Sequence, residues 1–232
     1  MSRFLTKIKK KKINEGEISI AILAAGKGSK IKSYEPRSLL KIRDKLLIEH
    51  QYEAVNSYFK NPEVITVVGC HANKIIKKIN LKSRIVENQL HEETNSSESL
   101  RLAFNNSSTT NFMFIHGDLY FNIETLDVCY EKSFIITDSS GMIKENEIGV
   151  TKIKNKASIL SYGLPLKWGQ IAFFTGKEYK ILQNMMQKFE LRDKKKLSFE
   201  IVNEIINAGG SFECFEPPEM KLLEIDRIKD IR

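Results

Sequence analysis

The run from Ile18 to Ala24 constrains the fold of this chain more than any other feature. Its residues are mostly apolar and rich in β-branched isoleucine, and they lead directly into a turn that holds Gly26 and Gly28. A short apolar run of this kind predicts a strand that is buried on both faces, as in a parallel sheet. Glycines let backbone N–H groups approach the oxygens of an anion closely. The turn therefore predicts a phosphate site, with an ordinary glycine turn bearing surface lysines as the alternative.

Strand and helix patterns alternate through the first half of the chain. We expect further strands over 64–68, 83–87 and 111–115, and helices over 44–59, 73–79 and 98–104. This alternation predicts an α/β fold with a parallel sheet and helices on both faces. Ligands of such sheets bind beyond the carboxyl ends of the strands. The glycine turn and Gly117-Asp118, which also follows a strand, are therefore expected to meet in space.

The alternation loosens after residue 130. We expect strands over 134–137, 171–174 and 212–216, a hairpin of 147–152 with 157–162, and helices over 178–189 and 198–208. No linker or internal repeat interrupts the sequence. We therefore predict a basic extension over 1–16 and one domain over 17–232, whose two halves divide near residue 120.

The composition excludes several classes of protein. The 232 residues are 41% hydrophobic and 28% charged, which is typical of a globular chain and not of a disordered or collagen-like one. No apolar run approaches the roughly 18 residues of a membrane span, and we expect no secretory signal, since the first residues lead into lysines. The three cysteines are far apart and match neither a disulfide framework nor a zinc motif. We expect a cytoplasmic protein.

Positive charge is concentrated at the start of the chain. The net charge is +8, and the first 17 residues hold six basic and two acidic side chains. A solvated terminus is the simpler interpretation, but such a stretch can also bind nucleic acid or an anionic membrane surface. A non-catalytic binding protein that uses this stretch is therefore one hypothesis. Deletion of residues 1–16 would abolish its function, whereas the activity of an enzyme would survive.

The segment LAAGKGSKIKSYEPRSLL, from Leu23 to Leu40, resembles the signature of the NTP-transferase superfamily, LAAGxGxR followed by PKxLL. Further segments resemble the family in the same order, namely DKLLIEHQYEAV, ITVVGCHANKI, FIHGDLYF and LLEIDRIKDI. The resemblance covers most of residues 18–232. It implies a single GT-A-like (Rossmann-like) domain with a mixed, mostly parallel central sheet, and a nucleotidyltransferase whose nucleotide-binding half precedes residue 120.

The resemblance also implies roles for individual residues. Lys30 and Arg37 would act on the phosphates as catalytic residues, and Asp118 and Asp226 would hold Mg²⁺. The nucleotide-binding set is Leu23, Ala24, Ala25, Gly26, Gly28, Asn88, Ser99 and Gly117. Two positions depart from the family pattern, because Lys30 replaces its usual arginine and Arg37 its usual lysine. Charge is kept at both, but an arginine presents a planar fork and a lysine a point charge.

The resemblance implies an NTP and a small phosphorylated acceptor as partners, with release of pyrophosphate. Around Asn88 and Ser99 the chain looks like the cytidylyltransferases of small phospho-compounds, which favours CTP; a sugar-1-phosphate transferase using UTP, dTTP or GTP is the alternative. Tyr162, Trp168 and Gln170 are candidates for the acceptor site, where an aromatic wall could hold an ammonium group. A structural role in the core is the commoner one for such residues. We expect no stable nucleic-acid complex, and a homodimer is one assembly that stays open.

Overall fold

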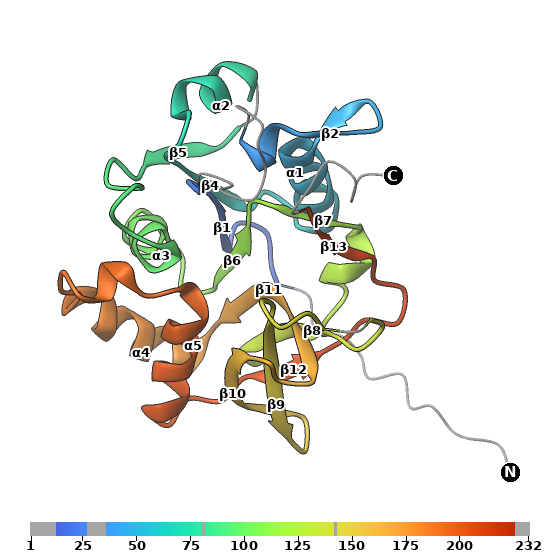
Figure 1. The fold of residues 1–232 in the computed structure, drawn as a ribbon, viewed down its shortest axis with the longest axis vertical. Coiled ribbons are helices and arrows are strands. Elements are labelled where there is room, and N and C mark those ends of the chain that lie inside the picture. Colours follow the sequence, from blue (N-terminus) through green and yellow to red (C-terminus); the bar gives the residue numbers. More distant parts are fainter. Residues whose placement is uncertain (1–12, 27–35, 80–81, 142, 226–232) are drawn as a thin grey trace, which may run out of the picture.

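The computed structural model describes residues 13–26, 36–79, 82–141 and 143–225. Within them, a nine-stranded mixed sheet forms the centre, with strand order β5-β4-β1-β6-β11-β8-β12-β10-β9 (Figure 1). The strands are β1 (Ser19–Ala24), β4 (Glu63–Val68), β5 (Arg84–Glu87), β6 (Phe112–His116), β8 (Phe134–Asp138), β9 (Ile148–Ile153), β10 (Lys156–Tyr162), β11 (Leu166–Phe174) and β12 (Glu213–Phe215). The predicted α/β fold with a mixed central sheet is confirmed.

The first half of the chain builds the parallel part of the sheet. Strand β1 lies parallel to β4 and β6, and β4 lies parallel to β5. Ile20 and Ile22 pack into the core on one face of the sheet, and Ala21 and Leu23 pack into the core on the other. Both faces of β1 are thus buried, as its continuous apolar run predicts. Helices α1 (Leu47–Tyr58), α2 (Ala72–Lys78) and α3 (Ser96–Asn105) connect these strands.

The second half of the chain adds antiparallel pairs. Strand β11 pairs antiparallel with both β6 and β8, so it joins the two halves of the sheet. Strands β9 and β10 form the predicted hairpin, and β9 also pairs with the start of β11, which closes these strands into a ring. Helices α4 (Gly176–Gln187) and α5 (Ser198–Asn207) lie on the same side of the sheet as α3 (Figure 1).

Several elements differ from the sequence-based expectations. The helix expected from residue 44 begins at Leu47, because β2 (Lys41–Ile42) and β3 (Lys45–Leu46) form a small hairpin first. The strand expected from residue 171 already begins at Leu166 and carries a bulge between Trp168 and Ala172. Short 3-10 helices at η1 (Arg37–Leu39), η2 (Ile123–Leu126) and η3 (Asp193–Lys195) were not expected either.

A second small sheet brings distant segments together. Strand β7 (Leu119–Phe121) pairs antiparallel with β13 (Leu222–Glu224). The backbone N–H of Ile225 also donates to the carbonyl of Asp118. The segment that directly follows Asp118 is therefore held beside the last described residues of the chain. No helix in the described part of the chain is both long and apolar enough to cross a membrane.

Candidate active site

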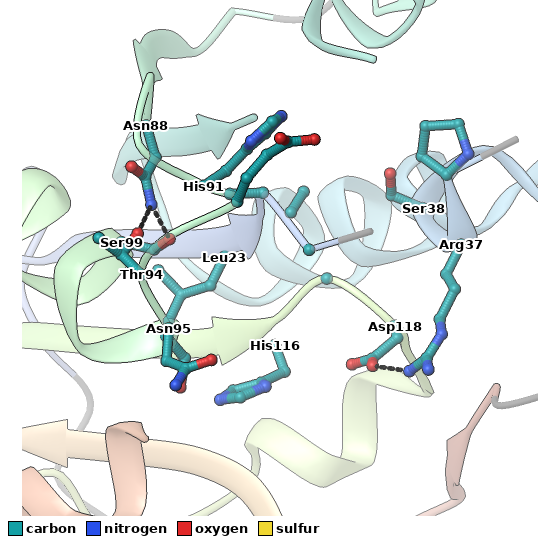
Figure 2. Close-up of a pocket in the computed structure, with 17 residues that line it drawn as sticks. Leu23, Arg37, Ser38, Asn88, His91, Thr94, Asn95, Ser99, His116 and Asp118 are labelled. Carbon is teal, nitrogen blue, oxygen red and sulfur yellow. Dashed lines mark hydrogen bonds and ion pairs between the residues drawn. The ribbon is translucent and has the colours of Figure 1, made fainter. Parts of the chain in front are cut away.

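A pocket of about 360 Å³ opens at the carboxyl ends of β1 and β6 (Figure 2). Its lining comes from four separated stretches of the chain, namely 23–26, 36–38, 88–99 and 116–118. Parallel strands end at one edge of a sheet, and this geometry brings together segments that are about 90 residues apart. Gly26, the part of the predicted glycine turn that the structure describes, lines this pocket together with Gly117 and Asp118.

Most of the residues predicted for the site line this pocket. They are Leu23, Ala24, Ala25, Gly26, Arg37, Asn88, Ser99, Gly117 and Asp118. Gly28, Lys30 and Asp226 lie outside the described residues. Lining the pocket shows where these residues lie, and their roles stay predictions.

The turn after β6 is held by close backbone packing and by one buried side chain. The N–H of Gly117 donates to the carbonyl of Leu23 at 2.9 Å, and a Cβ at Gly117 would lie 2.8 Å from Cα of Ala24. Only glycine fits this approach without a shift of the backbone. From α1, the fully buried amide of Gln51 donates to the carbonyls of His116 and Leu119 at 2.8 and 2.7 Å. Gln51 therefore clamps both sides of the turn that carries Asp118.

Arg37 and Asp118 form an ion pair at one end of the pocket. Nη1 of Arg37 lies 2.6 Å from Oδ2 of Asp118, and the two side chains are only 15% and 19% exposed. The arginine comes from η1, and the aspartate from the turn after β6. The other oxygen, Oδ1 of Asp118, is buried and has no hydrogen-bond partner among the described residues. One carboxylate oxygen is thus fixed by a cation while the other remains available to a ligand.

Asn88 organises the opposite end of the pocket. Its Nδ2 donates to the hydroxyls of Thr94 and Ser99, and its Oδ1 accepts from the N–H of Leu90. The side chain is buried, so these bonds fix the shape of the loop between β5 and α3. Both the nitrogen and the oxygen of the Asn88 amide thus have hydrogen-bond partners within the protein. In this structure Asn88 therefore shapes the wall of the pocket.

Residues 20–133 match the family model of the MobA-like NTP transferase domain. This stretch is an NTP transferase domain. The resemblance of the chain to the NTP-transferase superfamily is thereby confirmed, and with it the expected class of enzyme, a nucleotidyltransferase. The transferase domain contains every segment that lines the pocket. The comparison with curated proteins found no match.

Solved structures with the same fold extend the likeness over more than nine-tenths of the chain. CTP:phosphocholine cytidylyltransferase from Streptococcus pneumoniae (LicC) is 19% identical, with a TM-score of 0.75, over 92% of this chain and 96% of its own. The inositol-1-phosphate CTP transferase of T. maritima is 15% identical, with a TM-score of 0.75, over 94% and 93%. The nucleoside-diphosphate-sugar pyrophosphorylase of Vibrio cholerae RC9 is 13% identical, with a TM-score of 0.69, over 92% and 97%. At these identities the likeness shows a shared fold.

His116 is a further pocket residue of the transferase domain, and it is not among the predicted site residues. Its Nε2 lies 2.8 Å from Oγ of Ser198, the first residue of α5, and its ring meets the edge of Trp168 at 5.8 Å. Burial lowers the pKa of His116, with Arg37 adding to this effect and Asp118 opposing it. Burial therefore disfavours the charged form of the imidazole. The signal that could have found it is its position, directly before Gly117-Asp118 at the end of a buried strand.

The three residues predicted for the acceptor site do not line this pocket. Tyr162 is 52% exposed at the end of β10, while Trp168 is 2% exposed and packs behind His116. Gln170 has a left-handed φ of 55°, and its Nε2 donates to Oε2 of Glu224 at 2.7 Å. The position of Trp168 fits the core role that such residues commonly have. Contact of any of the three with an acceptor stays a prediction.

The described residues contain no group of three histidine, cysteine or acidic side chains that could hold a metal ion. Asp118 is the predicted ligand that the structure does describe, and its chemistry suits a hard cation. Mg²⁺ prefers carboxylate oxygens, and it usually binds one or two of them together with phosphates and water. The buried Oδ1 of Asp118, which has no described partner, is available for such a role.

Proposed function

We propose that this protein is a magnesium-dependent nucleotidyltransferase that transfers a nucleoside monophosphate from an NTP, with CTP favoured. The acceptor is the phosphate of a small compound, namely a phospho-amino alcohol, a phosphonate or a sugar 1-phosphate, and pyrophosphate is released. The observation that supports this proposal most is the convergence of the turn after β1 with Arg37 and Asp118 in one pocket.

The reaction that fits this pocket is an in-line displacement at phosphorus. An oxygen of the acceptor phosphate attacks the α-phosphorus of the NTP, and a new P–O bond forms. The bond from the α-phosphorus to the oxygen that bridges to the β-phosphate breaks, and this oxygen leaves with pyrophosphate. Negative charge builds on the α-phosphate during the step, and a cation at a fixed position lowers its energy. Arg37 is the described cation on the wall of the pocket that suits this role.

Two further roles follow from the same arrangement. The backbone from Leu23 to Gly26 lines the pocket and can present N–H groups to the nucleotide. Asp118 would hold Mg²⁺ together with Asp226, which the resemblance to the family adds. When it is bound, the ion neutralises charge on the phosphates.

The preference for CTP and for a small acceptor is supported by the named structural neighbours. One neighbour is a CTP:phosphocholine cytidylyltransferase and another is an inositol-1-phosphate CTP transferase. Both carry the fold of this chain over more than nine-tenths of its length. Their substrates therefore define the first acceptors to test, with a hexose 1-phosphate and an aminoalkyl phosphonate beside them.

The test is release of pyrophosphate from CTP, UTP, GTP, ATP and dTTP in the presence of Mg²⁺ and each acceptor. We expect release to depend on all three components and to be fastest with CTP. The variant Asp118→Asn should lower the rate about 100-fold or more, the range found when one charge-stabilising group is removed. Asp44→Asn, in the exposed turn between β2 and β3, is the matched control and should leave the rate unchanged. The proposal fails if no combination releases pyrophosphate, or if the Asp118 variant matches its control.

A further inference from the structure

His116 lies in the middle of the pocket, between the end that Asn88 shapes and the end that holds the Arg37–Asp118 ion pair. Figure 2 shows its ring between Asn95 on one side and the Arg37–Asp118 pair on the other. The ring cannot turn freely, because Phe114 and Trp168 lie at 5.9 and 5.8 Å from its centroid. A fixed imidazole at the centre of a binding pocket presents a polar nitrogen to whatever part of the ligand lies there.

Ser198 determines which nitrogen of His116 carries the proton. The hydroxyl of Ser198 is buried, with 1% of the residue exposed, and Nε2 of His116 is its hydrogen-bond partner among the described residues. Either atom of this pair could donate, but only donation from Ser198 gives its buried proton an acceptor among the described residues. Nε2 can accept only if it carries no proton, and a neutral ring then carries its proton on Nδ1. The Ser198 contact thus turns Nδ1–H of His116 into a hydrogen-bond donor, and no described residue is its partner.

We propose that Nδ1–H of His116 donates to a ribose hydroxyl of the bound nucleotide, and so selects ribonucleotides over deoxyribonucleotides. This inference rests on the proposed function, because it takes the pocket as the nucleotide site. The base would lie toward the loop that Asn88 and Ser99 shape, and the phosphates toward Arg37 and Asp118. The ribose joins these two parts of a nucleotide and therefore lies at the centre, where His116 is.

The inference predicts that a nucleotide without this ribose hydroxyl binds more weakly, because Nδ1–H of His116 is then left without an acceptor. A donor that the bound nucleotide shields from water and leaves without an acceptor lowers affinity by about tenfold or more. We expect the wild-type chain to bind CTP at least about tenfold more tightly than one of its two deoxy forms, 2′-deoxyCTP or 3′-deoxyCTP. The form that loses affinity identifies the hydroxyl that accepts from His116.

The experiment is calorimetric titration of the full chain with these three nucleotides in the presence of Mg²⁺, followed by pyrophosphate release with the same set. In His116→Gln the amide can reach Ser198 but offers no group at the position of Nδ1, so the ribose preference should fall to less than about threefold. In His116→Asn the amide lies near the position of Nδ1 and should keep part of the preference. Ser198→Ala frees the ring to take either tautomer, and we expect an intermediate ratio.

The control is His71→Asn, at a residue outside the pocket whose left-handed φ of 55° asparagine tolerates. It should leave the ratio unchanged, and thermal unfolding of each variant checks that it is folded. Equal affinity of the wild-type chain for CTP and both deoxy forms would overturn the inference, as would a preference that survives His116→Gln. If a preference that depends on His116 is found without release of pyrophosphate, the inference stands and the proposed function fails. If no nucleotide binds, both fail.

Discussion

Gln51 offers the sharpest test of how the fold positions Asp118. The perturbation is Gln51→Met, which keeps the length of the side chain and removes both donated hydrogen bonds. Gln51 is fully buried on α1, and it donates to the carbonyls on either side of Gly117-Asp118 at 2.8 and 2.7 Å. Loss of the amide leaves these two carbonyls without their side-chain donor.

The size of the effect follows from these two contacts. A neutral hydrogen bond contributes about 1 kcal/mol net, and a buried acceptor left unmatched costs about 1–3 kcal/mol. Two carbonyls would together cost about 3 kcal/mol. Oε1 of Gln51 is itself buried and has no hydrogen-bond partner among the described residues, so its removal offsets part of this cost. We expect the free energy of unfolding to fall by about 2–3 kcal/mol and the midpoint of thermal unfolding by about 5–10 °C.

The assay is urea unfolding beside pyrophosphate release, the latter at a temperature where every variant is folded. Gln183→Met is the matched control, because Gln183 is exposed on α4 and changing it removes no buried contact. The loss of activity in Gln51→Met should exceed the loss in the control, since the turn carrying Asp118 becomes less constrained. A difference in unfolding free energy of less than about 0.5 kcal/mol between the two variants would refute the reasoning.

Three further predictions concern single residues. Gly117→Ala places a Cβ 2.8 Å from backbone and should lower both stability and pyrophosphate release, whereas Gly141→Ala, with open space around it, should change neither. Burial alone would raise the pKa of Glu147, but hydrogen bonds and the charge of Lys167 at 2.7 Å lower it. Glu147→Gln should therefore destabilise the fold at about pH 7, and the difference should shrink as pH falls through the lowered pKa. Gln170→Gly should be more stable than Gln170→Ala by about 1 kcal/mol in urea unfolding, because alanine retains the left-handed strain; equal stability would contradict this.

The parallel half of the fold was predictable because its signals are local. The run from Ile18 to Ala24 is buried on both faces of the sheet, and one α-helix separates each large strand of this half from the next along the chain. Connections of this kind are short and right-handed, so topology follows from the order of elements. The same logic predicts that Gly26 and Asp118 lie at one edge of the sheet, and the resemblance to the family adds Arg37.

The contacts within the site were less predictable, because they depend on side chains from elements that no motif links. Gln51 lies on the apolar pattern of a helix, and nothing in that pattern shows that its amide donates to two carbonyls 65 and 68 residues away in the sequence. The pair of β7 with β13 joins segments about 100 residues apart through three residues each. Strands this short give no periodicity to detect.

Two residues beyond the stretch that matches the transferase family, which ends at residue 133, lie against His116 in the pocket. Trp168 supports the ring from behind, and Ser198 sets its hydrogen bonding. A relative could keep the glycine turn and Asp118 but lack a hydroxyl at position 198, and its imidazole would then be free to present an acceptor instead of a donor. The signature motifs alone therefore cannot decide how the ribose is recognised. Under the inference above, residues 116 and 198 together decide it, and the choice of nucleotide then depends on both halves of the fold.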